Sequence, residues 1–139
     1  MNATTGLFAA VFVLLHVAHL LADYPFQTDH QAAHKAGHGS ISRRALAAHA
    51  VTHVTVSLVL LMVGEAVLGF HVGAVPAVLA PLWLGLSHAA IDRRWPVTRW
   101  MTWARQAGFA AHGGAAHVDQ TAHVALGVLP AALLIAALS

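Results

Sequence analysis

Four apolar stretches alternate with polar connections along the chain, and each is long enough to cross the hydrocarbon core of a bilayer as a helix. The first ends near Tyr24, since a residue that precedes proline disfavours helical geometry. Because apolar and polar residues do not alternate as they would in strands, a barrel is not expected. The pattern predicts an all-α polytopic membrane four-helix bundle, with spans at about residues 5–22, 45–70, 75–91 and 118–138.

The connections between these spans differ in length and charge. Residues 23–44 and 93–116 are long and polar and hold all seven basic residues, whereas residues 69–74 form a short link. With four spans, the two long connections lie on the same side of the membrane. Basic residues favour the cytoplasmic side, so we expect both long connections in the cytoplasm and both termini outside.

The second long connection begins with the sequence WPVTRWMTW. Tryptophans beside arginines favour the headgroup layer of a membrane. We therefore expect a short interfacial helix over residues 95–106, with an ordinary aromatic anchor next to a span as the alternative.

Composition supports a single transmembrane domain over residues 1–139. Hydrophobic residues make up 58% of the chain and charged residues 9%, whereas soluble domains carry about 25% charged residues. The chain has no cysteine, which excludes disulfides and thiolate metal sites. Its net charge of +2 is too small for a nucleic-acid partner, so the bilayer is the expected surroundings.

Each predicted span carries one pair of metal-competent side chains four residues apart. Side chains at this spacing lie on the same face of a helix, one turn apart, and two of them can hold one metal ion. The pairs are His19 with Asp23, His49 with His53, His88 with Asp92, and Asp119 with His123.

The position of these pairs is more informative than their number. The pairs of the first and third spans lie at the C-terminal ends, and those of the second and fourth at the N-terminal ends. All four ends share one side of an up-down-up-down bundle, so the pairs meet near the cytoplasmic face. Asp23 and His49 are 26 residues apart, and Asp92 and Asp119 are 27 apart, which indicates two similar helical hairpins.

Ionisable groups inside a membrane are costly unless they are paired or functional, so we expect these eight to face the interior. Five imidazoles and three carboxylates without sulfur suit a divalent metal, with zinc favoured and iron or manganese as alternatives. Eight groups exceed one tetrahedral shell, which allows either two ions or one ion with outer carboxylates. His16 is the expected additional member.

Four motifs resemble an uncharacterised bacterial family of small membrane proteins, domain of unknown function 3307. They are HLLADYPFQTDHQAAHK, LAAHAVTHVTVSL, LGLSHAAID and VDQTAHVAL, in this order. The resemblance implies an integral protein of the bacterial inner membrane, without an established activity. The family pattern singles out Gln27, Lys35 and Gln120 as further site residues. The family is also loosely similar to membrane-bound metal-dependent hydrolases.

We therefore expect a metal-dependent hydrolase that activates water and acts on an amphipathic or lipid-like substrate at the cytoplasmic leaflet. Asp23 or Asp119 would accept the proton of the water, with Gln120 as a further catalytic candidate on the resemblance. The candidates for contact with the substrate or an anion are Gln27, Lys35, Arg43 and Arg93, with Arg94 beside them. Alternatively, these basic residues only set the topology.

Three other functions use the same side chains. A transporter of divalent metal or protons needs them near the middle of the membrane, with access from both faces. A haem-binding subunit needs room between paired histidines for a flat ring. A structural subunit would hold a metal without turnover. The sequence also leaves open whether the chain acts alone or as an oligomer.

Overall fold

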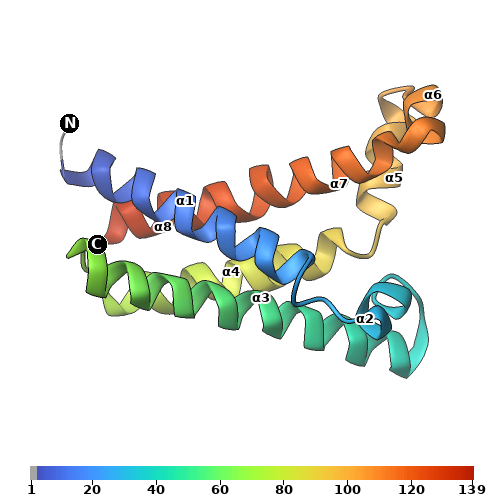
Figure 1. Ribbon diagram of the computed structural model, residues 1–139. Coiled ribbons are helices and arrows are strands. Elements are labelled where there is room, and N and C mark those ends of the chain that lie inside the picture. The colour runs from blue at the N-terminus through green and yellow to red at the C-terminus, as the bar shows by residue number, and fades with distance from the viewer. Residues whose placement is uncertain (1–2) are drawn as a thin grey trace.

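The computed structural model describes residues 3–139, and it is helical almost throughout (Figure 1). The short helices α2, α5 and α6 lie between the long ones, and two π-helical segments, η1 and η2, interrupt the last long helix. The elements in chain order are α1 (Ala3–Asp23), α2 (Asp29–His34), α3 (Gly39–Leu68), α4 (Ala74–Ile91), α5 (Trp95–Trp103), α6 (Ala107–Phe109), η1 (Ala110–Gly114), α7 (Ala115–Ala122), η2 (His123–Val128) and α8 (Leu129–Leu138).

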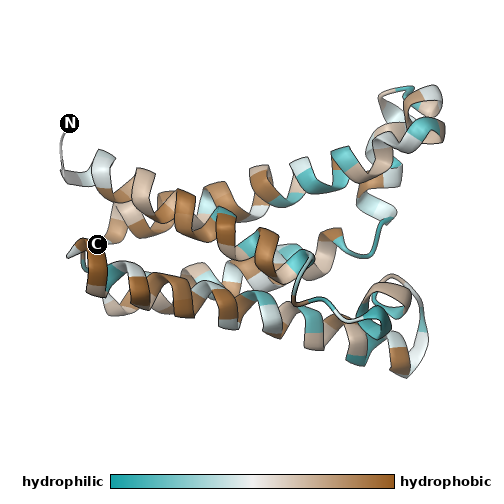
Figure 2. Cartoon of the chain, in the orientation of Figure 1, coloured by the Kyte–Doolittle hydropathy of each residue, from teal (hydrophilic) through white to brown (hydrophobic). Residues whose placement is uncertain are grey.

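Four long helical segments pack as an antiparallel bundle. Helix α1 packs against α3 and α8, and α4 packs against the same two partners. The two ends of the chain lie at one end of the bundle, and α2, α5 and α6 lie at the other (Figure 1). All the basic residues belong to the segments around α2 and α5, so this end, here called the basic end, is the polar one (Figure 2).

Local sequence explains where the helices begin and end. Helix α1 stops at Asp23, two residues before Pro25. Helix α2 begins with a capping box, in which the Thr28 hydroxyl and the Gln31 side chain satisfy each other's backbone N–H groups. Helix α3 ends at Gly69, whose φ of 71° is left-handed and favours glycine.

Long helical segments cover the four predicted spans, with different boundaries. Helix α3 begins at Gly39, before the predicted start at residue 45, and the last helical segment begins at Ala107 rather than near residue 118. The first extension is polar and the second consists mostly of alanine and glycine, so hydropathy alone marks neither as part of a span. A kink at Gly113, with φ of 88°, separates the extension from the rest of that segment. Over residues 95–106, the helix α5 covers Trp95–Trp103.

Four segments are long and apolar enough to cross a membrane: Thr4–Asp23, Gly39–Leu68, Ala74–Ile91 and Ala107–Leu138. Their outward faces carry large apolar side chains, which would be costly in water but are suited to lipid. Examples from the four segments are Val13, Met62, Val67, Val78, Leu86, Leu126 and Leu133, each at least half exposed.

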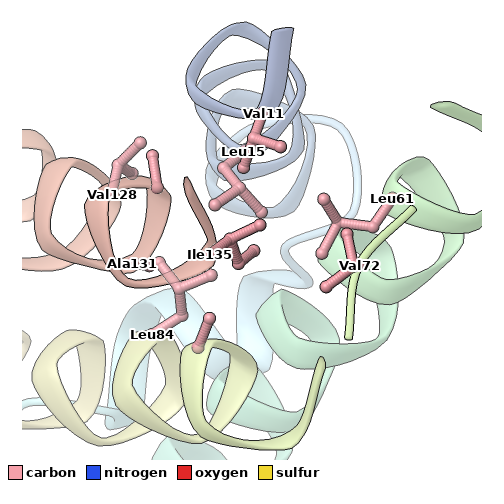
Figure 3. Packing of buried hydrophobic residues seen from close by; sticks show 10 residues of the cluster. Val11, Leu15, Leu61, Val72, Leu84, Val128, Ala131 and Ile135 are labelled. Atoms are coloured by element: carbon pink, nitrogen blue, oxygen red, sulfur yellow. The ribbon is translucent and has the colours of Figure 1, made fainter. Parts of the chain in front are cut away.

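The interior divides into an apolar half and a polar half. Val11, Leu15, Leu61, Val128 and Ile135 belong to a buried apolar cluster near the ends of the chain (Figure 3). Helices α3 and α4 approach closely beside it, because Gly85 leaves no side chain between them: a Cβ there would lie 2.9 Å from Cγ2 of Val54. Toward the basic end, histidine and aspartate replace the apolar residues in the interior.

Candidate metal centre

Five histidines and three aspartates meet inside the polar half of the bundle. The pairs are His19 and Asp23 of α1, His49 and His53 of α3, His88 of α4 with Asp92 directly after it, and Asp119 of α7 with His123, the first residue of η2. Seven of these side chains are buried, whereas 26% of the surface of the Asp119 side chain is exposed. The helical spacing thus brings all eight predicted side chains together.

The Asp23 carboxylate lies at the centre of the group. Its Oδ1 atom lies 3.1 Å from Nε2 of His49, 3.1 Å from Nε2 of His53 and 3.3 Å from Nε2 of His88. Three imidazole nitrogens from two helices therefore surround one carboxylate oxygen.

Gln120 connects the first and last long helical segments at this point. Its Nε2 donates a hydrogen bond to Oδ2 of Asp23 over 2.9 Å. Its Oε1 lies 3.0 Å from Nε2 of His19. Gln120 therefore fixes the orientation of both the α1 carboxylate and the α1 imidazole, as hydrogen-bonding partners behind metal ligands do.

Lys35 brings a fixed positive charge into the cluster. Its ammonium donates to Nε2 of His49 over 2.9 Å and lies 3.0 Å from Oδ1 of Asp92. Its side chain is 12% exposed, and that of Asp92 is 4% exposed. Lys35 therefore lies on the boundary between the cluster and its surroundings.

Three polar groups lie close to Nε2 of His49. Its Nε2 accepts from Lys35, yet it also lies 3.1 Å from Oδ1 of Asp23 and 3.1 Å from Nε2 of His88. Its other ring nitrogen, Nδ1, is buried without a hydrogen-bond partner. Because Nε2 accepts from Lys35, it presents an electron pair to the Asp23 carboxylate, and electron pairs that face one another favour a cation between them.

His123 has the form of a metal ligand. Its Nδ1 lies 3.0 Å from the carbonyl oxygen of Asp119, and this oxygen can only accept, so Nδ1 carries the proton. The electron pair of the ring is then on Nε2, which is buried and has no hydrogen-bond partner. A donated N–H on one nitrogen and an open electron pair on the other are typical of histidines that bind metal.

The ligand atoms form three overlapping groups, each with atoms within 4.8 Å of one another. The groups are His19, Asp23, His53 and His88; His49, His88 and Asp92; and Asp92, Asp119 and His123. A cavity of about 10 Å³ lies among His19, His53, His88 and His123. Three members of the first group line this cavity, but Asp23 does not. The first group is here called the closed group, because all four of its side chains are buried.

A larger cavity opens beside the third group, here called the open group. Its volume is about 390 Å³, and its walls include the carboxylates Asp92 and Asp119. The other residues of its walls are Gln27, Ala32, Lys35, Arg94, Val97, Thr98, Ala115 and Ala116. A small molecule in this cavity can therefore reach two potential metal ligands.

Asp92 is the acidic group of the cluster that lies just beyond the end of α4. Burial opposes its ionisation, but the neighbouring His88 ring and the Lys35 ammonium outweigh burial and lower the pKa of its carboxyl to about 2. Asp92 is therefore negatively charged at neutral pH, as a metal ligand needs to be.

The residues expected to contact substrate or an anion separate into two sets. Gln27 and Lys35 line the large cavity. Arg93 instead donates to the carbonyl oxygen of Gly37 over 2.7 Å and thereby holds the turn before α3. Arg43 lines an apolar groove between α3 and α4, away from the large cavity.

Two features of the site do not follow from the sequence patterns. Arg94, rather than its neighbour Arg93, lines the large cavity. The π-helical segment η2 begins at His123, and such insertions often accompany functional sites. His16 lies outside all three ligand groups, because its ring stacks on Phe12 with the ring centres 6.1 Å apart.

The comparison with protein families agrees with the resemblance that the four sequence motifs indicate. The family model DUF3307, described as a protein of unknown function, matches residues 11–138. The chain belongs to this family. The match includes every residue of the three ligand groups, so the candidate metal centre lies within the matched region. Neither a curated protein nor a solved structure gives a significant match to the chain.

Proposed function

We propose that the chain is a membrane-embedded, metal-dependent hydrolase whose centre lies near the cytoplasmic leaflet. One observation carries this proposal: two members of the open group, Asp92 and Asp119, line a cavity of about 390 Å³, and Asp119 is partly exposed, whereas every member of the closed group is buried. A ligand set with three protein groups and an accessible side is typical of catalytic metal sites.

The closed group supplies a second position for an ion. Four ligand-type side chains on three helices match the number of ligands in a structural tetrahedral site. Nitrogen and oxygen ligands without sulfur fit zinc first, with iron or manganese as alternatives. We therefore propose two divalent ions, one in the closed group and one in the open group. The Lys35 ammonium lies next to the third group, of His49, His88 and Asp92.

The residues of the site have different roles in the proposed hydrolysis. A divalent ion in the open group would lower the pKa of water to about 7 and polarise the bond under attack. Asp119 is the carboxylate that both faces the cavity and is partly exposed, so it is suited to accept the proton of the attacking water. Asp23 is buried among three imidazoles, which suits a ligand better than a base.

The surroundings favour an amphipathic substrate. Four segments are apolar enough to span a membrane, and the basic end carries the cavity. Positive charge favours the cytoplasmic side, so the cavity would open near that leaflet. Helix α5 exposes Trp95, Trp100 and Trp103 beside the cavity, which suits the headgroup layer where a lipid-like substrate is found.

Transport is supported less well than hydrolysis. A carrier needs polar access from both faces, but Val11, Leu15, Leu61 and Ile135 pack as an apolar cluster between the metal centre and the other end of the bundle (Figure 3). Haem binding also fits poorly, because ring centres of His53 and His88 lie only 3.5 Å apart. A macrocycle would not fit between them.

Hydrolysis of model esters in the purified, metal-loaded protein tests the proposal. Para-nitrophenyl phosphate and para-nitrophenyl butyrate report attack of water on phosphorus and on a carbonyl, since each releases nitrophenol and an acid. We expect turnover of at least one ester that disappears after chelation and in His123→Ala. His16→Ala is the matched control, because His16 lies outside all three groups and should keep its turnover. Turnover that survives chelation or His123→Ala would contradict the proposal.

A further inference from the structure

The large cavity has a mixed electrostatic lining that a bound metal would change. Its charged residues are two cations, Lys35 and Arg94, and two carboxylates, Asp92 and Asp119. The carboxylates belong to the open group, so a divalent ion there would neutralise them. The two basic side chains would then leave the cavity positively charged and attractive to an anion.

Arg94 adopts a backbone conformation that is unusual for a residue with a side chain. Its φ is 63°, in the left-handed region, where α4 has ended and α5 is about to begin. Glycine is the residue that most readily adopts this conformation after a helix, because it has no Cβ. Arg105 also has a positive φ, of 55°, but of these two arginines it is Arg94 that lines the large cavity.

The Arg94 side chain is also available for a ligand. Within residues 3–139 its guanidinium makes no hydrogen bond and no ion pair, although it lines the cavity. The adjacent Arg93 is already engaged by the carbonyl oxygen of Gly37 and the hydroxyl of Ser42. Of these two neighbouring arginines, Arg94 is therefore the one that can bind something in the cavity.

We propose that this cavity binds the phosphate group of the substrate, with Arg94 and Lys35 as the anion-binding residues. A guanidinium matches two oxygens of a phosphate at once, and Lys35 adds a compact charge close to the open group. This assignment rests on the proposed function, because it names the substrate class of the same site. The phosphate could belong to a lipid headgroup or to a soluble phosphate ester.

Calorimetric titration of the purified protein tests the assignment with two probes, inorganic phosphate and dihexanoyl phosphatidic acid. We expect Arg94→Gln to weaken the binding of both by about tenfold, because one charge-assisted contact is lost. Arg99→Gln is the matched control: Arg99 is exposed in α5, close in sequence, and outside the cavity. Its affinities should stay within about twofold of wild type. Equal losses in the two variants, or none in Arg94→Gln, would overturn the assignment.

The two probes also distinguish the source of the phosphate. If the lipid binds at least about tenfold tighter than inorganic phosphate, the acyl chains contribute and a lipid headgroup is the substrate group. If the two affinities are equal, a soluble phosphate ester is favoured. Both results support a phosphate site when they depend on Arg94.

Arg94→Gly separates ligand binding from a role in folding. Glycine relieves the left-handed backbone, so the melting temperature should stay the same or rise while phosphate binding weakens as in Arg94→Gln. A lower melting temperature with unchanged binding would assign Arg94 a structural role and overturn the proposal. The titrations use zinc-loaded protein, because without an ion the two carboxylates balance the two basic side chains and phosphate should bind more weakly. Zinc-loaded protein that binds phosphate through Arg94 but hydrolyses neither ester would contradict the proposed function and leave this assignment standing.

Discussion

The Lys35 ammonium donates a hydrogen bond to Nε2 of His49 over 2.9 Å, across the boundary between the short α2 region and the long helix α3. The same ammonium lies 3.0 Å from Oδ1 of Asp92. A lysine therefore contributes a fixed positive charge to a buried cluster that otherwise consists of imidazoles and carboxylates. The consequence is that Lys35 stabilises the cluster when metal is absent.

Lys35→Met should destabilise the metal-free protein. The substitution leaves Asp92 buried without its lysine partner, and removal of one member of a buried pair costs about 3 kcal/mol or more. Added zinc should restore much of this loss, since a cation replaces the missing charge. Thermal denaturation in detergent, with chelator and then with zinc, measures both effects. Lys35→Arg keeps the charge and is the control; a chelated Lys35→Met protein that melts like wild type would disprove the role.

Gln120→Ala should weaken metal binding without unfolding the bundle. The amide orients Asp23 and His19, and loss of such outer partners typically lowers metal affinity by about 10–100-fold. Competition with a chromophoric chelator measures the affinity. Thr121→Ala, next to Gln120 on the same helix and exposed, should bind metal like wild type. Equal affinities in Gln120→Ala and wild type would show that the amide is dispensable.

The proposal of two ions predicts different outcomes for the two kinds of group. Asp119→Asn removes a charged ligand from the open group only, so this variant should keep one of two ions and lose turnover. Asp23→Asn affects the closed group, so it should lower the metal content of that position and the stability of the fold. Metal analysis by mass spectrometry, together with melting temperatures, distinguishes the variants. The account of the open group fails if Asp119→Asn keeps both ions.

The long helices could be predicted because hydropathy and the positions of proline act locally. The boundaries could not: the first turn of α3 is polar and residues 107–117 are mostly alanine and glycine, so hydropathy marks neither as part of a span. In the structure, α2 packs against α3 and α5 packs against α7. The capping box of Thr28 and Gln31 is a local signal for α2, although hydropathy places these residues in a connection between spans.

The clustering of the candidate ligands could also be predicted, because a spacing of four residues places two side chains on one helical face. Their pairing across the bundle could not. That Gln120 bonds to Asp23, and that Lys35 rather than Arg93 reaches the cluster, depends on the rotation of each helix about its axis. The positive φ of Arg94 likewise has no signature in the sequence.

Gly85→Leu should destabilise the bundle. A Cβ at this position would lie 2.9 Å from Cγ2 of Val54, so the close contact between α3 and α4 must open. Overpacking of this kind costs about 1–3 kcal/mol. Gly108→Leu is the matched control, because a Cβ there meets nothing within 4 Å. Thermal denaturation of both variants provides the comparison, and equal melting temperatures would contradict the packing described for the two helices.

The central claim is that imidazoles and carboxylates from four helical segments bind divalent metal inside the bundle. The most direct test is metal analysis of the detergent-purified wild-type protein, as isolated, after chelation and after dialysis against zinc. The account predicts two divalent ions per chain, their loss on chelation and their return with zinc. Protein that is folded but holds no metal as isolated, and takes up none from zinc, would contradict it.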